Sequence, residues 1–272
     1  MQRLNRILSA VLDLLILPFR SLDPVWSLTA VSLISGLFFL LIFKWTSDQD
    51  ALFQSKQKVK AHLLELRLFG SDMVLTLRAQ RDLLMANLRY VGHTLKPMLI
   101  LLLPMVLLLV QLDARYARRP LDVGDTTLLR VSLAADAPSG TWPTLELPEG
   151  VTVDGPALHI PSLREINWRL RVDAPGVHRL RILMNETTLE KLLHAGDGLF
   201  PLSDRIRQSS LGSMAQAAEP RLDAAAKVQS ISLEYPEREL RVLGWNTHWL
   251  LFFFVVSVVP AYLVKGLFGV EV

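Results

Sequence analysis

The chain has 272 residues, a formal net charge of +3 and a mean hydropathy of +0.32. Hydrophobic residues make up 51% and charged residues 20%, which excludes a largely disordered chain and favours membrane segments. The absence of cysteine excludes disulfides, thiolate metal sites and a cysteine nucleophile.

Residues 1–22 are expected to form an amphipathic helix that lies in the membrane interface. Apolar residues recur every three or four positions and give one continuous face, which Asp13 interrupts. The alternative is a signal peptide, because Arg3 and Arg6 precede an apolar run. No small-residue cleavage site follows before Pro18, so the interfacial helix is the favoured interpretation.

Three apolar stretches are expected to be transmembrane helices, at residues 25–45, 97–113 and 244–265. The first contains nineteen consecutive uncharged residues, which at ~1.5 Å each cover a hydrocarbon core of about 30 Å. The apolar runs inside the second and third, 97–112 and 249–264, have only sixteen residues each, so we expect the bilayer to thin or flanking lysines to snorkel. Pro104 and Pro260 lie inside them, a position that membrane bundles tolerate.

The basic residues predict the orientation in the membrane. Eight lysines and arginines lie between the first two spans: Lys56, Lys58, Lys60, Arg67, Arg78, Arg81, Arg89 and Lys96. Because basic loops stay in the cytoplasm, residues 46–96 and the tail 266–272 are expected there, with the N-terminus outside. The segment 114–243 then lies outside as well, since long domains translocate largely regardless of charge. The expected location is a bacterial inner membrane.

Residues 46–96 are expected to fold as a cytoplasmic helical hairpin. Apolar residues repeat at coiled-coil spacing in both halves: Leu52, Val59, Leu63 and Leu66, then Leu77, Leu84, Leu88 and Val91. Gly70 ends the first helix, and the second runs toward the second span with a break expected at residues 92–97. Three interpretations of the basic residues stay open: contact with anionic lipid head groups, contact with ribosomal RNA, and a solvated face that sets topology.

The segment 114–243 is expected to be an inserted all-β domain, an immunoglobulin-like sandwich. Five β-like runs are separated by turn signals: Leu128–Leu133, Thr144–Leu147, Val151–Asp154, Ile166–Val172 and Val177–Leu183. The last two runs alternate apolar and basic residues, and the short link 173–176 predicts a hairpin between them. Residues 202–227 are expected to be loosely helical, and 228–235 to form another strand.

No residues with the spacing of a catalytic or metal site are found, so neither an enzyme nor a cofactor is expected. The six histidines form no ligand pair, and nucleotide-binding motifs are absent. The polar residues of the spans are the only candidate site: Thr29, Ser32, Ser35, Gln111, Ser257 and Tyr262. They predict either ordinary small-residue helix packing or a shallow polar groove for client segments.

The order of these parts resembles the YidC-type membrane insertase superfamily, in particular its archaeal and endoplasmic-reticulum members. Leu22-Asp23-Pro24 precedes the first span, while Lys96-Pro97-Met98 and Leu103-Pro104 stand at the second. The resemblance covers residues 1–113 and 244–272. It implies a three-span core with a basic hairpin that handles hydrophobic client polypeptides without nucleotide. Many members also carry a basic residue within the groove, whereas the nearest candidates here, Lys44 and Lys96, lie at the membrane edges.

The expected partners follow from this resemblance. They are the lipid bilayer, client polypeptides or partner membrane subunits, and the ribosome through the hairpin; DNA is not expected. A second function remains open, in which the chain is a structural subunit of an envelope complex. Its spans would then anchor the β-domain, which would bind an envelope partner.

Overall fold

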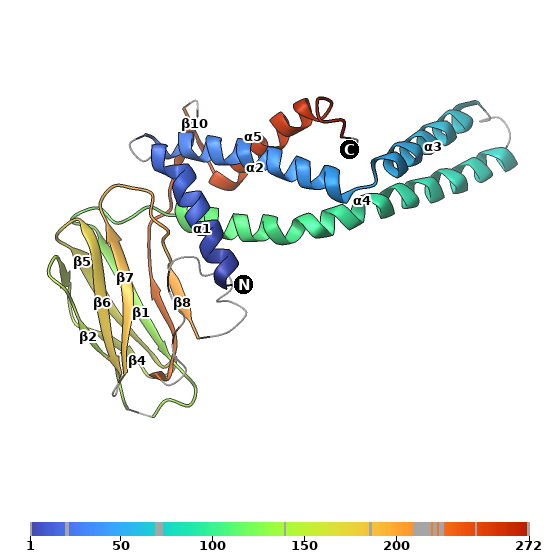
Figure 1. The fold of residues 1–272 in the computed structure, drawn as a ribbon. Helices are drawn as coiled ribbons and strands as arrows, with labels where there is room; N and C mark the ends of the chain where they lie inside the picture. Colours follow the sequence, from blue (N-terminus) through green and yellow to red (C-terminus); the bar gives the residue numbers. More distant parts are fainter. Residues whose placement is uncertain are drawn as a thin grey trace. The chain divides into compact units, whose positions relative to one another are not determined.

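A computed structural model describes residues 2–19, 22–68, 73–138, 140–184, 187–208, 219, 222, 226–242 and 244–270. Within them the chain forms five α-helices and antiparallel β-sheets (Figure 1). The chain divides into two compact units. The first unit comprises Met1–Ser27 and Leu107–Trp249, and the second comprises Leu28–Val106 and Leu250–Val272.

The helices agree in kind with the sequence-based expectation. They are α1 (Gln2–Ile16), a short 3-10 turn (Leu17–Phe19), α2 (Pro24–Thr46), α3 (Gln49–Leu68), α4 (Met73–Tyr116) and α5 (Trp249–Val264). By length and composition, α2 and the part of α4 from residue 80 to 116 could cross a membrane. The third expected span, α5, has only 16 residues.

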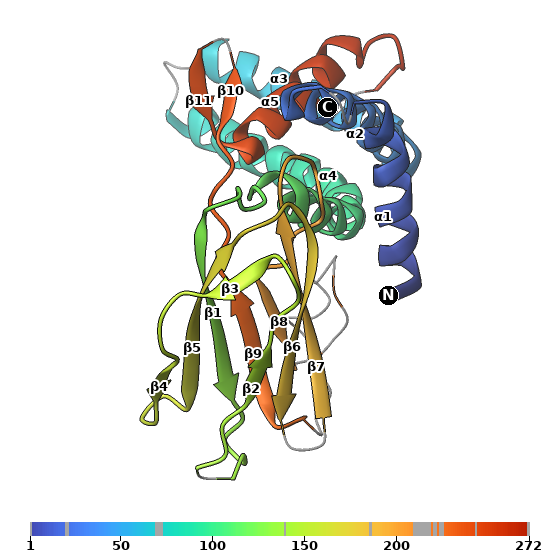
Figure 2. The same ribbon diagram turned by 90° about the vertical axis from the view of Figure 1, so that its left-hand side faces the viewer.

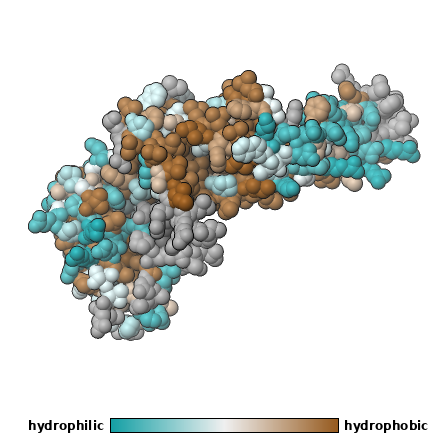
Figure 3. All heavy atoms as spheres, in the orientation of Figure 1, coloured by the Kyte–Doolittle hydropathy of each residue, from teal (hydrophilic) through white to brown (hydrophobic). Residues whose placement is uncertain are grey.

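Both long helices leave most of their apolar surface uncovered. Only 39% of the apolar window of α2 and 22% of that of α4 is buried. The core helix of a soluble protein would be mostly buried, so these fractions favour membrane insertion. Apolar residues gather on the surface over α2, α5 and the later turns of α4 (Figure 3). The position of α2 near the N-terminus would also fit a signal sequence.

The second unit contains the expected helical hairpin of α3 and the first half of α4 (Figure 1). The break expected at residues 92–97 does not occur, because α4 continues through Pro97 and Pro104 to a length of 44 residues, ~66 Å. A proline removes one backbone hydrogen bond and bends a helix, but strong helix formers on both sides keep it continuous.

The coiled-coil packing predicted for the hairpin is largely wrong. Leu52 is buried as expected, but Leu63 on α3 is exposed. The four apolar residues predicted to pack from α4 are also exposed: Leu77, Leu84, Leu88 and Val91. Ala86, on the opposite face, is the buried residue of this stretch, and it lines a small cleft with Ala51 of α3. Ala86 therefore faces the cleft beside α3, and the leucines lie on the exposed side of α4. The side chain of Leu66 lies outside the described part.

The first unit contains two antiparallel sheets (Figure 2). The larger contains β1 (Thr126–Leu133), β3 (Val151–Val153), β4 (Leu158–Ile160), β5 (Glu165–Val172), β8 (Arg205–Arg207) and β9 (Val228–Leu233). Its order is β3-β5-β1-β9-β8, and β4 also pairs with β5. The smaller has the order β2-β6-β7: Thr144–Glu146, Gly176–Met184 and Thr187–Ala195. A two-stranded ribbon, β10 (Leu240–Val242) and β11 (Trp245–Thr247), precedes α5.

Alternation along the strands confirms which faces are buried. Leu170 of the larger sheet and Leu180 of the smaller belong to one hydrophobic core. The hairpin predicted across residues 173–176 is wrong, however, because β5 pairs with β1 and β3, while β6 pairs with β7 and β2. The link therefore crosses between sheets. An alternating pattern specifies the face that enters the core, but two strands of opposite sheets show the same pattern as a hairpin.

The expectation of a loose helix at residues 202–227 is also wrong where the structure describes it, since residues 205–207 form strand β8. Much of the remaining excursion lies outside the described residues. Glu219 is described, and its carboxylate lies 2.6 Å from the buried ammonium of Lys191. Burial lowers the pKa of Lys191, and the charge of Glu219 opposes that shift.

Side chains satisfy the outer edge of β7. Glu219 Oε1 accepts a hydrogen bond from Leu192 N at 2.9 Å. The hydroxyl of Tyr235 accepts one from His194 N at 3.1 Å and donates to Leu192 O at 3.2 Å. Leu121 N donates to His194 O at 3.2 Å. At residues 192 and 194, the N–H and C=O groups that point away from β6 are therefore all hydrogen-bonded.

The histidine on this edge predicts a pH dependence of stability. Burial, reinforced by the charge of Lys191, lowers the pKa of His194 below its ordinary 6.5. Unfolding restores the ordinary pKa of His194. The folded state is therefore most stable, with respect to this histidine, above about pH 6.5. Its free energy of unfolding decreases as the pH falls through the unfolded-state pKa and then the folded-state pKa. We expect the melting temperature of the full chain in detergent to drop less on acidification in His194→Gln. Equal acid sensitivity of the two proteins would contradict this.

Candidate functional site

A buried arginine joins α1 to the last turns of α4. The Arg115 side chain is 1% exposed. On α1, Leu12 and Ile16 are buried, and Asp13 lies next to Leu12 in the sequence. The apolar face of α1 therefore packs inward with the carboxylate at its border, which is the geometry that a buried cation requires.

All five N–H groups of Arg115 have partners. Nη2 lies 2.7 Å from Asp13 Oδ1 and 2.8 Å from Ser9 Oγ, and Nε lies 3.2 Å from the same carboxylate oxygen. Nη1 donates to Gln111 Oε1 at 2.6 Å and to the Gln111 carbonyl at 3.1 Å. The guanidinium is thus held in one orientation by two helices. We call these four residues (Ser9, Asp13, Gln111 and Arg115) the Arg115 cluster.

A second polar contact follows one residue later on α4. The hydroxyl of Tyr116, which is fully buried, donates to Ser27 Oγ at 2.8 Å. Ser27 in turn donates to the carbonyl of Pro24 at 2.9 Å, in the first turn of α2. The end of α4 is therefore fixed by polar contacts to both α1 and the start of α2.

The Arg115 cluster places a permanent charge among apolar helices. Removing an ion from water costs several kcal/mol, which a close counter-ion and hydrogen bonds offset. Asp13 supplies that counter-ion and is itself 49% exposed, so one side of the cluster remains open to the surroundings. The cluster can therefore offer hydrogen bonds to a polar group that approaches this side. The described residues include no group of three potential metal ligands among His, Cys, Asp and Glu.

Of the predicted groove residues, only Gln111 belongs to the Arg115 cluster. Ser32 and Ser257 are buried and donate to carbonyls of their own helices, those of Leu28 at 2.6 Å and Phe254 at 3.2 Å. Ser35 is also buried, Thr29 is half-buried, and Tyr262 is exposed beneath the ammonium of Lys265.

The place of a groove between α2 and α5 is occupied by close helix packing. Gly36 lies directly against the main chain of Ser257, where a Cβ atom would collide with the carbonyl oxygen. Small residues permit such an approach between membrane helices. The structure therefore gives Ser32, Ser35 and Ser257 the environment of a packed helix pair.

The basic residues of the hairpin are spread over both helices. Lys58 and Arg89 line the cleft between α3 and α4. Lys60, Arg78 and Arg81 are exposed, Lys56 is half-buried, and the side chain of Arg67 lies outside the described part.

Sequence reasoning missed Arg115 because it falls just after the second apolar stretch, where a basic residue is ordinary. Its signal was Asp13. A carboxylate that interrupts an otherwise apolar helical face requires a partner, and the arginines after the second span were the candidates.

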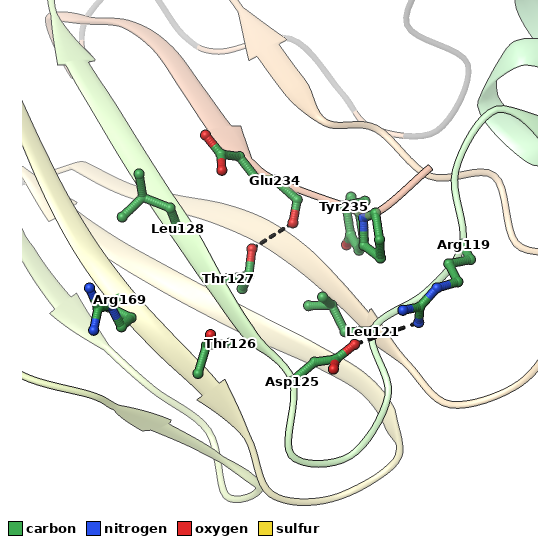
Figure 4. Close-up of a pocket in the computed structure, with 10 residues that line it drawn as sticks. Arg119, Leu121, Asp125, Thr126, Thr127, Leu128, Arg169, Glu234 and Tyr235 are labelled. Atoms are coloured by element: carbon green, nitrogen blue, oxygen red, sulfur yellow. Dashed lines mark hydrogen bonds and ion pairs between the residues drawn. The ribbon is translucent and has the colours of Figure 1, made fainter. Parts of the chain in front are cut away.

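The domain of the first unit also has an open depression of about 560 Å³ (Figure 4). Its charged lining residues are already paired. Arg119 Nη1 forms ion pairs with Asp122 Oδ2 at 2.7 Å and with Asp125 Oδ2 at 3.5 Å. Glu234 and Arg169 pair with residues outside the depression. Because these charges neutralise one another, the depression is a weaker candidate than the Arg115 cluster.

Comparisons with family models, curated proteins and solved structures gave no match to this chain.

Proposed function

We propose that this protein is a membrane-protein insertase or membrane chaperone of the YidC type, which handles hydrophobic client segments without nucleotide. The order of its elements supports this: α1, the apolar helix α2, the hairpin, the apolar half of α4, the β-domain and the apolar helix α5. The observation that carries the proposal is the Arg115 cluster, the basic site that sequence reasoning had not located.

An arginine kept among apolar helices is costly, and such residues usually serve function. A client segment that enters a bilayer brings polar backbone and side-chain groups that lipid cannot satisfy. Ser9, held by the guanidinium, and the half-exposed carboxylate of Asp13 could exchange hydrogen bonds with those groups. The cluster would thus lower the barrier to insertion without chemical change in the client.

The membrane placement belongs to the same proposal. Trp26 and Trp45 are exposed and stand nineteen residues apart in α2, ~28 Å along the helix, like the two aromatic belts of a bilayer. The 16 residues of α5 span ~24 Å, so the third span would thin the bilayer locally. The hairpin would be cytoplasmic, and the paired sheets would be the exoplasmic immunoglobulin-like sandwich.

Thiol labelling tests this orientation. Gln57 on α3 and Thr188 on β7 are both exposed, and the chain has no native cysteine. In intact cells a membrane-impermeant maleimide should label Thr188→Cys and leave Gln57→Cys unlabelled until the membrane is opened. The reverse pattern would contradict the orientation and the resemblance built on it.

Reconstitution tests the function. Purified protein in lipid vesicles should speed the insertion of a single-span client, and Asp13→Asn with Arg115→Gln should slow it about tenfold, the effect of ~1.4 kcal/mol on a barrier. The double variant removes both charges and keeps groups that hydrogen-bond. Arg179→Gln, which removes an exposed arginine of β6, is the matched control. An unchanged insertion rate in the folded double variant would reject the proposal.

The structural-subunit alternative is favoured by one observation. Val153, Leu158 and Leu163 are exposed apolar residues along the β3–β4 edge of the domain. If this edge binds an envelope partner, polar substitutions there would release that partner, and charge removal at Arg115 would leave the function intact.

A further inference from the structure

One face of α4 carries a long row of exposed apolar residues, interrupted between Leu77 and Leu84 by Gln80 and Arg81. In the hairpin the row contains Leu77, Leu84, Leu88, Val91 and Leu95. It continues as Met98, Leu102 and Val106 in the apolar half of the helix. Each of these side chains is between 47% and 61% exposed. At about 100° per residue they all fall within about 60° of one line, ~43 Å long. We call this set the α4 row.

The hairpin part of the α4 row is unusual because it stands among charges. Arg78, Arg81 and Arg89 are exposed and lie to one side of the row, Arg81 about 50° from it and the other two about 110° to 130°. Such a segment does not enter the hydrocarbon core, so its leucines would face water. Exposed apolar surface that is contiguous marks an interaction site. Ala86 lines the cleft beside α3, and no described hairpin side chain covers the row on the other side of α4.

We infer that the α4 row binds a single apolar helix of a client polypeptide and leads it to the bilayer. This inference rests on the proposed function and gives it a location. The row is one helix face wide, which suits a helix that docks through residues spaced three and four apart. From Leu84 to Val106 the row is uninterrupted over ~33 Å, slightly more than the ~30 Å of a twenty-residue client helix, so it offers apolar surface along the whole length of such a client.

The charges beside the α4 row indicate the chemistry of that helix. Arg78, Arg89 and Lys96 lie on one side of the row, whereas Gln80 and Asn87 lie on the other. Between residues 77 and 112, Asp82 is the only carboxylate. An apolar helix with acidic residues along one side would therefore complement the row better than one with lysines there.

The experiment uses the full chain in nanodiscs and a synthetic apolar helix of about twenty residues. One form of the peptide carries two glutamates along one side, and the other carries two lysines. We expect the glutamate peptide to bind at least tenfold more tightly. Leu84→Ser with Leu88→Ser should weaken its binding about tenfold or more. Met85→Ser is the matched control: Met85 is 47% exposed and lies ~80° from the row, so binding should be unchanged.

Disulfide crosslinking locates the contact. Single cysteines at Leu84, Leu88 and Leu95 should capture a peptide that carries one central cysteine, and a cysteine at Met85 should not. Equal capture at all four positions, or undiminished binding to the double serine variant, would overturn the inference. Crosslinks between two copies of the chain at Leu88, in place of peptide capture, would also overturn it and assign the row to self-association.

This binding assay needs no insertion, so it separates the two proposals. If the charge-free Arg115 variant inserts clients normally while the peptide still binds the α4 row, the row stands and the insertase proposal falls. If insertion depends on Arg115 but the peptide does not bind the α4 row, the insertase proposal stands and the docking inference falls. Because the substituted side chains are exposed, an unchanged melting temperature should show that the variants are folded.

Discussion

Asp13→Asn should destabilise the protein by about 3 kcal/mol, the lower end of the range for breaking a buried ion pair. The substitution keeps the shape of the side chain and an oxygen that accepts hydrogen bonds, but it leaves the guanidinium of Arg115 buried without a counter-ion. Because Asp13 is half-exposed, water would compensate part of the loss. Thermal unfolding of the purified protein in detergent, followed by circular dichroism, measures the effect.

The reverse substitution should cost less, and this asymmetry is the sharper test. Arg115→Met leaves a carboxylate that water can already reach, although Gln111 loses its hydrogen bond with Arg115. Combining Arg115→Met with Asp13→Asn should restore much of the stability lost in Asp13→Asn alone, since no buried charge remains. If the two effects simply add, the charges do not interact in the way the 2.7 Å contact indicates.

Gly36→Ala should destabilise the second unit by about 1–3 kcal/mol, the cost of overpacking. A methyl group at this position would collide with the backbone carbonyl of Ser257, and backbone cannot move aside as a flexible side chain can. The helices α2 and α5 must then separate, which also removes contacts of their neighbours. The melting temperature in detergent and the yield of folded protein report the loss.

Gly92 provides the matched control for this substitution. It also lies inside a helix, α4, but a Cβ there would meet nothing within 4 Å. Gly92→Ala should therefore stabilise by about 0.5–1 kcal/mol through helix propensity alone. If both alanines have the same effect, the approach of α2 to α5 is not as close as the structure has it.

The helices and several strands of this chain could be predicted from the sequence, but which strand pairs with which could not. Nineteen uncharged residues identify α2, and alternation around Leu170 and Leu180 identifies two strands of the core. These signals are local, because they depend only on which face of an element avoids water. The assignment of β5 and β6 to different sheets depends on distant strands, and no local pattern contains it.

The candidate site shows the same limit. The spacing of Leu84 and Leu88 is that of a coiled coil, yet both side chains are exposed and Ala86 occupies the buried face. Arg115 follows the second apolar stretch, where a basic residue is common, and its partner Asp13 lies 102 residues away in the sequence. No local pattern therefore indicates that they pair. In both cases the sequence allows more than one partner: an apolar side chain can pack on several neighbours, and an arginine can pair with several carboxylates.

The satisfied edge of β7 determines how the β-domain can recognise another protein. A sheet with an open edge can accept an extended segment of a partner as an additional strand. At residues 192 and 194 this route is closed, because Glu219, Tyr235 and Leu121 already hold the backbone groups that such a segment would need. At the opposite edge of the same sheet, β2 has only three residues. An added strand on this part of β7 would therefore first have to displace Tyr235 and the carboxylate of Glu219.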